Sequence, residues 1–238
     1  MPRIDLWRQN LSEVPEWVWD CHTADWLNLA ENQLRSISPR LSELLQLRML
    51  DLGHNQLTSI PDSIAALVGL RDYLYLSDNH FQDVPEWIGN LSQLRYLNVT
   101  DNELTSLPSR MGELHSLREL RLYNNRLSSL PSSVGNLRNL RELHLDNNVL
   151  VELPESIGQL SALRELSLRN NRLAELPGSM RALSRLARLD LRQNRLPTLP
   201  EWLLELGELE KLDLRWNPLE HVPAWVDELE ARGCAVLL

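Results

Sequence analysis

Several features that commonly indicate a function are scarce in this sequence. Its two cysteines, Cys21 and Cys234, lie near opposite ends of the 238-residue chain, which excludes a disulfide framework and a cysteine-ligated metal site. No apolar run is long enough to span a bilayer, and the opening MPRIDLWRQN lacks the basic and apolar regions of a secretory signal. We therefore expect a reducing, cytoplasmic setting.

Basic residues and phenylalanine are also few. The chain has 24 Lys and Arg against 33 Asp and Glu, which gives a net charge of −9. That charge disfavours general attraction to nucleic acid. One phenylalanine stands beside eight tryptophans, so we expect a core built in layers of aliphatic side chains.

Known catalytic and cofactor motifs are missing as well. There is no P-loop, no glycine-rich dinucleotide loop, no HExxH and no GxSxG. The six histidines are scattered, and none stands at ligand spacing to a cysteine or another histidine. We expect no enzymatic activity, no cofactor and no metal. Asp78 and Asp101 are expected to be neighbours, but two carboxylates are too few for a calcium site.

What the sequence does have is a repeat that covers the whole chain. An asparagine follows each LxL pair, and Gln9 holds this place in the first repeat. Every step is 23 residues except the one from Asn55 to Asn79, which is 24. The repeated asparagines are Asn32, Asn55, Asn79, Asn102, Asn125, Asn148, Asn171, Asn194 and Asn217.

The unit reads LxxLxLxxNxLxxLPxxIGxLxx, and on this motif the chain resembles leucine-rich repeat proteins. The LPxxIGxL segment is similar to the 23-residue subclass of Ras-group and LAP-type proteins and of many bacterial intracellular repeat proteins. The resemblance implies an α/β solenoid, a curved horseshoe with a parallel sheet on its concave face and short 3₁₀ or α turns on its convex face. It also suggests a bacterial source and permits a role as an effector delivered to a host cell.

The physical chemistry of the unit leads to the same fold. In LxL the two leucines point to one face of a short strand and the residue between them to the other. One repeat cannot bury its leucines without its neighbours, so strands stack in parallel about 4.8 Å apart. The asparagine can satisfy backbone groups where the chain leaves the sheet, which makes it a structural residue. Proline after the last leucine fixes φ and starts the convex segment.

We expect a single domain of ten repeats over residues 1–238. Residues 1–23 form an atypical first repeat, 24–222 are regular, and 223–238 read as a helix followed by a strand that caps the C-terminal end. The strand near Arg3–Leu6 is expected to be an exposed edge. The longer step predicts a bulge around Arg71–Tyr73.

The positions between and beside the leucines face solvent on the concave sheet, so we look there for a binding site. Aromatic residues with no core to fill are candidate hot spots for a protein partner. Alternatively, they only stack across strands to stabilise the sheet. The candidate partner-binding residues are Trp26, Met49, Tyr73, Tyr75, Tyr96, Tyr123, Glu119, Glu142, His144, Asp78 and Asp101.

Charged columns accompany the aromatic residues. Glu119, Glu142 and Glu165 are expected to stack as like charges, which costs stability unless Arg118, Arg141, Arg164 or a partner's basic group offsets it. Further along, Arg169, Arg192 and Arg215 alternate with Asp190 and Asp213 in what reads as a solvated lattice of ion pairs.

These observations favour a non-enzymatic scaffold that binds a partner protein on its concave face, with the acidic columns as steering charges. One alternative is binding of a small molecule or glycan by the aromatic residues, which a gently curved sheet encloses poorly. Another is a structural role through self-association of the N-terminal edge strand. The chain is expected to be a monomer or to self-associate weakly through that strand.

Overall fold

The computed structural model describes residues 2–238. Within them, eleven short strands form one parallel sheet whose spatial order follows the sequence from β1 to β11. The strands are β1 (Arg3–Asp5), β2 (Trp26–Asn28), β3 (Met49–Asp51), β4 (Tyr73–Tyr75), β5 (Tyr96–Asn98), β6 (Glu119–Arg121), β7 (Glu142–His144), β8 (Glu165–Ser167), β9 (Arg188–Asp190), β10 (Lys211–Asp213) and β11 (Ala235–Leu237).

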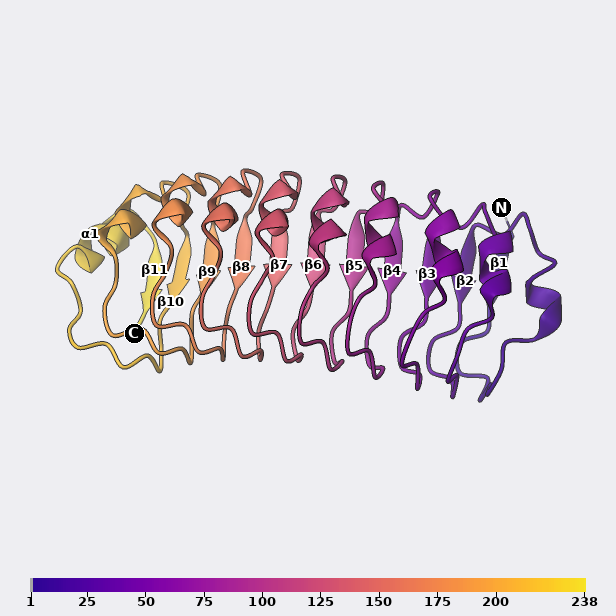
Figure 1. Cartoon of the computed structure of the whole chain (residues 1–238). Coiled ribbons are helices and arrows are strands. Elements are labelled where there is room, and N and C mark those ends of the chain that lie inside the picture. Colours follow the sequence, from indigo (N-terminus) through magenta and orange to yellow (C-terminus); the bar gives the residue numbers. More distant parts are fainter. Residues whose placement is uncertain (1) are drawn as a thin grey trace.

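A single 3₁₀ turn crosses the opposite face between successive strands up to β10. The turns are η1 (Glu16–Val18), η2 (Pro39–Glu43), η3 (Asp62–Ala66), η4 (Glu86–Asn90), η5 (Ser109–Glu113), η6 (Ser132–Asn136), η7 (Glu155–Gln159), η8 (Gly178–Ala182) and η9 (Glu201–Glu205). One α-helix, α1 (Val226–Ala231), follows β10 and packs on β11. Figure 1 shows the strands side by side along one face of an open solenoid and the helical turns along the other.

The registers explain why the leucines are invariant. From β2 to β10 the central leucine of each strand pairs with the central leucine of the next, for example Leu120 with Leu143 and Leu143 with Leu166, whereas Ile4 and Val236 hold this place in β1 and β11. These three leucines are essentially inaccessible to solvent. The residues on either side of each leucine point away from the core, which leaves them on the concave face. The leucine-rich repeat solenoid expected from the sequence is thus confirmed.

The repeated asparagines are structural, as predicted. Asn148 Nδ2 donates to the carbonyls of Leu122 and Leu145, both at 3.0 Å, and its Oδ1 accepts from the amide of Leu127 at 2.9 Å. One side chain therefore joins its own repeat to the repeat before it at two points. Eight of these asparagines are buried, from Asn32 to Asn194.

The residue before each asparagine has a backbone conformation that the sequence pattern did not reveal. It adopts a left-handed φ in every repeat, from 51° at Asp78 to 62° at Trp216. Asparagine and aspartate tolerate this region better than most residues, which explains why they occupy most of these positions. Asp78 and Asp101 belong to this turn, so their placement first serves the backbone.

Proline and glycine shape the convex side. Proline precedes most of the turns with an extended ψ and a φ near −65°, as Pro131 does before η6. Within the turns, Gly112, Gly135 and Gly158 allow close packing of successive repeats. A Cβ on Gly135 would lie 2.4 Å from the carbonyl oxygen of Ser156. The φ of Gly135 is not in the left-handed region. Glycine is therefore needed here for the close approach of the two turns and not for its backbone conformation.

The extra residue of the longer repeat is absorbed ahead of β4. The amides of Arg71 and Asp72 both donate to the carbonyl of Arg48, at 3.2 and 2.9 Å. Tyr73 then pairs with Met49 in the same register as the other strands. In regular repeats the first strand residue makes the second of these contacts, as Glu119 does with Arg95, so Asp72 is the extra residue. The irregularity lies in the predicted segment, directly before β4, and leaves the register of the strand unchanged.

Candidate binding surface

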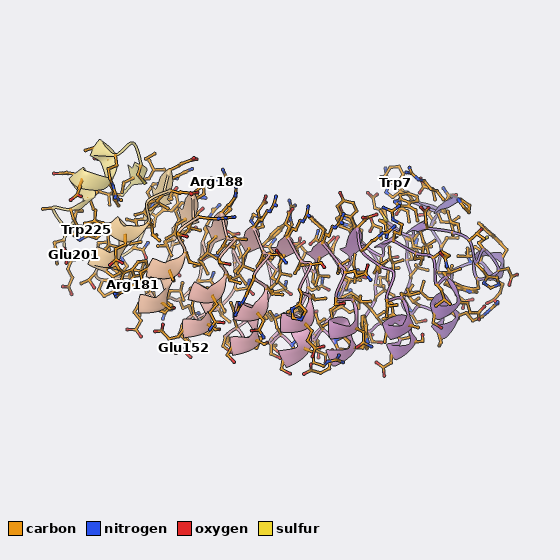
Figure 2. All side chains as sticks on the ribbon, turned by 90° about the horizontal axis from the view of Figure 1, so that it is seen from above. Trp7, Glu152, Arg181, Arg188, Glu201 and Trp225 are labelled. Carbon is orange, nitrogen blue, oxygen red and sulfur yellow. The ribbon has the colours of Figure 1, made fainter. Side chains whose placement is uncertain are left out.

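The candidate aromatic residues fall on adjacent strands of the concave face. Cross-strand pairing places Trp26 beside Met49, Met49 beside Tyr73, and Tyr73 beside Tyr96. Tyr75 lies on the same face as Tyr73, since two residues separate them within β4. In Figure 2 the labelled Arg188 and Trp7 lie on this side of the solenoid, whereas Arg181 and Glu152 lie on the opposite side.

Three tyrosines make direct contact with one another. The ring centroids of Tyr73 and Tyr75 lie 5.8 Å apart, those of Tyr73 and Tyr96 5.4 Å, and those of Tyr75 and Tyr96 5.0 Å. The guanidinium of Arg121 covers Tyr96 at 5.5 Å from the ring centroid. We call Tyr73, Tyr75 and Tyr96 the tyrosine cluster. Tyr73 keeps 45% of its surface exposed, so the cluster presents aromatic surface to solvent.

The other predicted aromatic positions lie outside this cluster. Trp26 is two strands away and is half-buried under the guanidinium of Arg3, which lies 5.8 Å from its ring. Met49 fills the position between Trp26 and Tyr73. Tyr123 follows β6 in the turn and takes part in none of the ring contacts found in residues 2–238. The sequence therefore placed these residues on neighbouring strands of one face, and the structure shows that the rings of three of them are in contact.

Partial burial raises the pKa of two phenols of the cluster, Tyr75 and Tyr96. Burial raises the pKa of Tyr96 well above its usual range, although the positive charge of Arg121 opposes that change. Burial also raises the pKa of Tyr75, assisted by the nearby carboxylate of Asp51. Both phenols are neutral at physiological pH, as tyrosine ordinarily is, and can donate hydrogen bonds to a bound partner.

The stacked glutamates are neutralised in a different way from the one expected. Glu119 accepts a hydrogen bond from Arg121 Nε at 2.6 Å, and Glu165 accepts from Arg188 Nε at 2.8 Å. Arg118, Arg141 and Arg164 form no ion pair within residues 2–238. Arg121 and Arg188 are better placed because their side chains leave the same concave face as the glutamates.

Glu142 stands between these two pairs and has no arginine partner. Its Oε2 lies 3.5 Å from His144 Nε2, and that imidazole nitrogen is inaccessible to solvent and accepts or donates no hydrogen bond within the described chain. One ligand atom each from Glu119, Glu142 and His144 lies within 4.8 Å of the others. Carboxylates with an imidazole suit a divalent cation, but Arg121 already neutralises Glu119 and opposes a second cation there.

Asp78 and Asp101 do not share a ligand position. Asp78 Oδ2 lies 2.6 Å from His54 Nδ1, whereas Asp101 Oδ1 accepts a hydrogen bond from Asn124 Nδ2 at 2.6 Å. Each carboxylate is engaged by a neighbour from the adjacent turn. These pairs stabilise the row of left-handed turns.

The C-terminal half of the concave face is a lattice of ion pairs. Asp213 accepts hydrogen bonds from Arg215 Nε at 2.9 Å and Nη2 at 2.8 Å, and Arg192 Nε lies 3.4 Å away. Arg192 also binds Asp190. Burial opposes ionisation of Asp213, but the hydrogen bonds from Arg215 and the charge of Arg192 outweigh it and lower its pKa. Arg192 and Arg215 thus form the predicted lattice with Asp190 and Asp213, whereas Arg169 donates from Nε to Gln193 Oε1 at 3.2 Å and forms no ion pair in the described residues.

Sequence reasoning overlooked two polar hollows at the border of the concave sheet. One, of about 300 Å³, is lined by residues that include Arg95, Arg118, Arg141 and Arg164. The other, of about 250 Å³, lies between Arg95 and Arg118 and the rings of Tyr73 and Tyr96. The sequence contains a pattern that could have predicted these arginines, since the dipeptide LR directly precedes the strand in each of these repeats.

In residues 2–238 no helix combines the length and the apolar character needed to cross a membrane.

Comparisons with known proteins agree with the architecture. A mouse protein named leucine-rich repeat and calponin homology domain-containing protein 1 is 38% identical over 93 residues, which cover 39% of this chain and 13% of the mouse protein. A solved Leptospira interrogans LRR protein, LIC12759, superposes with a TM-score of 0.92 at 37% identity, over 99% of this chain and 60% of that one.

A third relative was solved with a bound partner. The LRR ectodomain of the Arabidopsis thaliana membrane receptor kinase GASSHO1/SCHENGEN3, in complex with CASPARIAN STRIP INTEGRITY FACTOR 2, gives a TM-score of 0.80 at 33% identity, over 91% of this chain and 27% of that one. The chain thus spans only a fraction of the length of these relatives. The family described as leucine-rich repeat region matches residues 20–129, 86–168 and 132–231. Since these segments together cover most of the sequence, the chain belongs to the leucine-rich repeat family.

Proposed function

We propose that this chain is a non-enzymatic scaffold that binds a partner protein on its concave face. The observation that carries the proposal is the tyrosine cluster, in which Tyr73, Tyr75 and Tyr96 contact one another on the sheet surface and not in the core. Tyrosine at a protein surface supplies a large apolar area at low entropic cost and a polar group at its end. The plant relative solved with a bound factor supports the same use of this fold.

The charges around the cluster are arranged to orient a partner. Glu119 and Glu142 border it on the C-terminal side, and Trp26 and Met49 border it on the N-terminal side. A partner with an apolar segment flanked by basic residues would match this order. The acidic residues would accelerate its encounter, and the rings would hold it once bound.

The proposal is tested by comparing three forms of the protein. The first is the native chain, the second carries Tyr73→Ala and Tyr96→Ala, and the third carries Trp17→Ala. Trp17 is the matched control, because it is 52% exposed and lies in η1 on the convex side. Each form is immobilised, captured proteins are identified by mass spectrometry, and the recovered partner is then titrated against all three.

We expect one partner to be captured by the native chain and by the Trp17 variant, with about tenfold or greater weakening in the tyrosine variant. Circular dichroism should be the same for all three, since the substitutions leave the leucine core intact. Equal affinity for the tyrosine variant would reject the concave site and leave sheet stabilisation as the role of these rings. A change in tryptophan fluorescence with members of a sugar panel would instead support glycan binding.

We also propose that the chain works in the bacterial cytoplasm. Both cysteines are free, and Cys234 is buried, which suits a reducing compartment. The likeness to a Leptospira protein supports a bacterial source. Fractionation of the source cells checks the location, and recovery in the culture medium would contradict it.

A further inference from the structure

Four arginines occupy the same place in four consecutive repeats. Each comes directly before the first residue of strand β5, β6, β7 or β8, and backbone amides of the row donate to the carbonyl of the arginine before. The bond from Arg118 to Arg95 is 2.8 Å, and the bond from Arg141 to Arg118 is 2.7 Å. The set continues to Arg164 at the same spacing, about 4.8 Å for parallel strands. We call Arg95, Arg118, Arg141 and Arg164 the arginine row.

The arginine row lacks the internal partners that other arginines of the sheet have. Arg48 pairs with Asp72, Arg121 with Glu119 and Arg188 with Glu165. Among residues 2–238, no guanidinium of the row forms an ion pair or a side-chain hydrogen bond. All four side chains are exposed. In a chain with a net charge of −9, this is a local excess of positive charge that the fold does not neutralise.

Like charges on neighbouring strands lower stability, so the row costs the isolated protein some stability. Two of the three glutamates beside it are bound elsewhere, because Glu119 and Glu165 accept from Arg121 and Arg188, and Glu142 forms no ion pair with the row in residues 2–238. The row therefore remains available to an anion from outside the chain.

The row also has a recess into which an anion can enter. It lines the hollow of about 300 Å³ together with Ser116, Asn139, Ala162 and Arg185. Asn139 is fixed in this wall by a hydrogen bond of 2.8 Å from its Nδ2 to the carbonyl of His115. The second hollow shares Arg95 and Arg118 with the first and adds Tyr73 and Tyr96, together with the carboxylates of Asp72 and Glu119. The guanidinium groups therefore continue from the first hollow to the aromatic rings, and the charge of the border is most positive in the first hollow.

The chemistry of this border favours carboxylates on a peptide. Guanidinium groups bind carboxylates through two parallel hydrogen bonds. Side chains on one face of an extended peptide lie about 6.7 Å apart, because they repeat every two residues. The arginines of the row start from strands about 4.8 Å apart, and their long side chains can reach carboxylates at that wider spacing. A uniformly charged phosphate backbone would also meet Glu119, Glu142 and Glu165 beside the row and be repelled. Discrete carboxylates can contact the row and avoid that column.

We propose that the arginine row is a second binding site, which takes an extended acidic segment of a protein partner. The identity of the partner as a protein rests on the proposed function, whereas the anion chemistry rests on the row alone. Contact with the row would place neighbouring residues of the segment against Tyr73 and Tyr96.

The test uses a fluorescein-labelled peptide of alternating glutamate and alanine. About ten residues suffice, because an extended chain rises roughly 3.3 Å per residue and so spans four repeats. The comparison probes are the same peptide with glutamine for glutamate and an oligothymidylate of equal charge. Fluorescence anisotropy measures binding to the native chain at low and high salt.

Two triple variants remove equal charge from different surfaces. One carries Arg118→Gln, Arg141→Gln and Arg164→Gln. The control carries Arg126→Gln, Arg172→Gln and Arg195→Gln, which are exposed arginines in the turns that follow the repeated asparagines. Circular dichroism verifies that both variants are folded.

We expect the glutamate peptide to bind the native chain and the control variant with affinities within about twofold, and the row variant at least about tenfold more weakly. High salt should weaken binding. Equal losses in both triple variants would attribute binding to overall charge and overturn the site. Equal binding of the glutamine peptide, or binding of the oligothymidylate in place of the peptide, would overturn it as well.

The two proposals can fail separately. Peptide binding that survives Tyr73→Ala with Tyr96→Ala, in a protein that captures no partner, rejects the concave scaffold but supports the anion site. Capture of a partner through the tyrosine cluster, without any affinity for the glutamate peptide, rejects the arginine row alone.

Discussion

At the scale of single residues, the repeated asparagine carries more of the fold than its size suggests. Asn148 makes its hydrogen bonds to Leu122, Leu127 and Leu145, and is 6% exposed. No other side chain of similar volume offers both two donors and an acceptor in that geometry. Loss of this side chain leaves three buried backbone groups without partners.

We therefore expect Asn148→Ala to lower the free energy of unfolding by roughly 3 kcal/mol. Urea denaturation followed by circular dichroism measures this change. Asn139→Ala is the matched control, because Asn139 is exposed and makes one side-chain hydrogen bond; its cost should stay below about 1 kcal/mol. Similar losses for the two variants would contradict a structural role for the buried asparagine.

A second residue-scale prediction concerns pH. Asp213 is 1% exposed, and Arg215 and Arg192 lower its pKa despite its burial. A carboxyl with a lowered folded pKa adds stability above its unfolded pKa, near 4, and loses that contribution as the pH falls through the folded value. The native chain should therefore lose stability as the pH falls below about 4.

Asp213→Asn should be less stable than the native chain at neutral pH and show a flatter acid dependence. Thermal denaturation across that pH range provides the measurement. Asp83→Asn serves as the control, since Asp83 is exposed and takes part in no ion pair within residues 2–238. If the native slope persists in Asp213→Asn, other carboxyl groups cause the acid loss.

At the scale of elements, contacts between successive 3₁₀ turns depend on glycine. η6 packs on η7, and a Cβ added to Gly135 would lie 2.4 Å from the carbonyl oxygen of Ser156 and 2.7 Å from its Cβ. The nearest atom belongs to the backbone, so it cannot move aside as the end of a side chain would. The turns must separate to admit a methyl group.

We expect Gly135→Ala to lower the free energy of unfolding by about 2 kcal/mol. Gly207→Ala is the control, because no atom lies within 4 Å of the corresponding Cβ position. That variant should be neutral or slightly stabilising. Chemical denaturation of both variants gives the comparison, and an unchanged midpoint for Gly135→Ala would show that the turns are more loosely packed than described.

The elements also show what a sequence can predict in this fold. The positions of the strands followed from the 23-residue period, because leucines can be buried only against a neighbouring repeat. The partners of long charged side chains did not follow. Arg118 was one of the groups that could have offset the charge of Glu119, but the glutamate binds Arg121. Both arginines are near in sequence, and only the direction in which each side chain leaves the backbone distinguishes them.

The same limit applied to the candidate site. The columns placed Tyr73, Tyr75 and Tyr96 together because pairing register is fixed by the leucines. Tyr123 was grouped with them as another outward-facing aromatic residue, although its turn position keeps it out of the ring contacts. The left-handed backbone at Asp78 was invisible to hydrophobic periodicity, which records side-chain burial and not φ.

At the scale of the whole molecule, each repeat contacts mainly the repeats before and after it. The sheet order follows the sequence from β1 to β11, and packing between turns likewise joins neighbours. Stability in such a solenoid is a sum of terms for single repeats and for the interfaces between them. A defect should therefore act differently in the middle of the stack and at its end.

This reasoning predicts different outcomes for two equivalent core substitutions. Leu143 in β7 and Leu27 in β2 are both fully or almost fully buried, so truncation to alanine costs each site roughly 2–5 kcal/mol. Leu143→Ala weakens an interface with several repeats on either side, and local opening there should expose β6 to β8. Leu27→Ala has one repeat beyond it, so opening should be confined to β1 through β3. Hydrogen exchange of backbone amides distinguishes the two patterns. Loss of protection along all eleven strands in both variants would mean that the solenoid opens as one cooperative unit, and the sum over neighbouring repeats would not describe it.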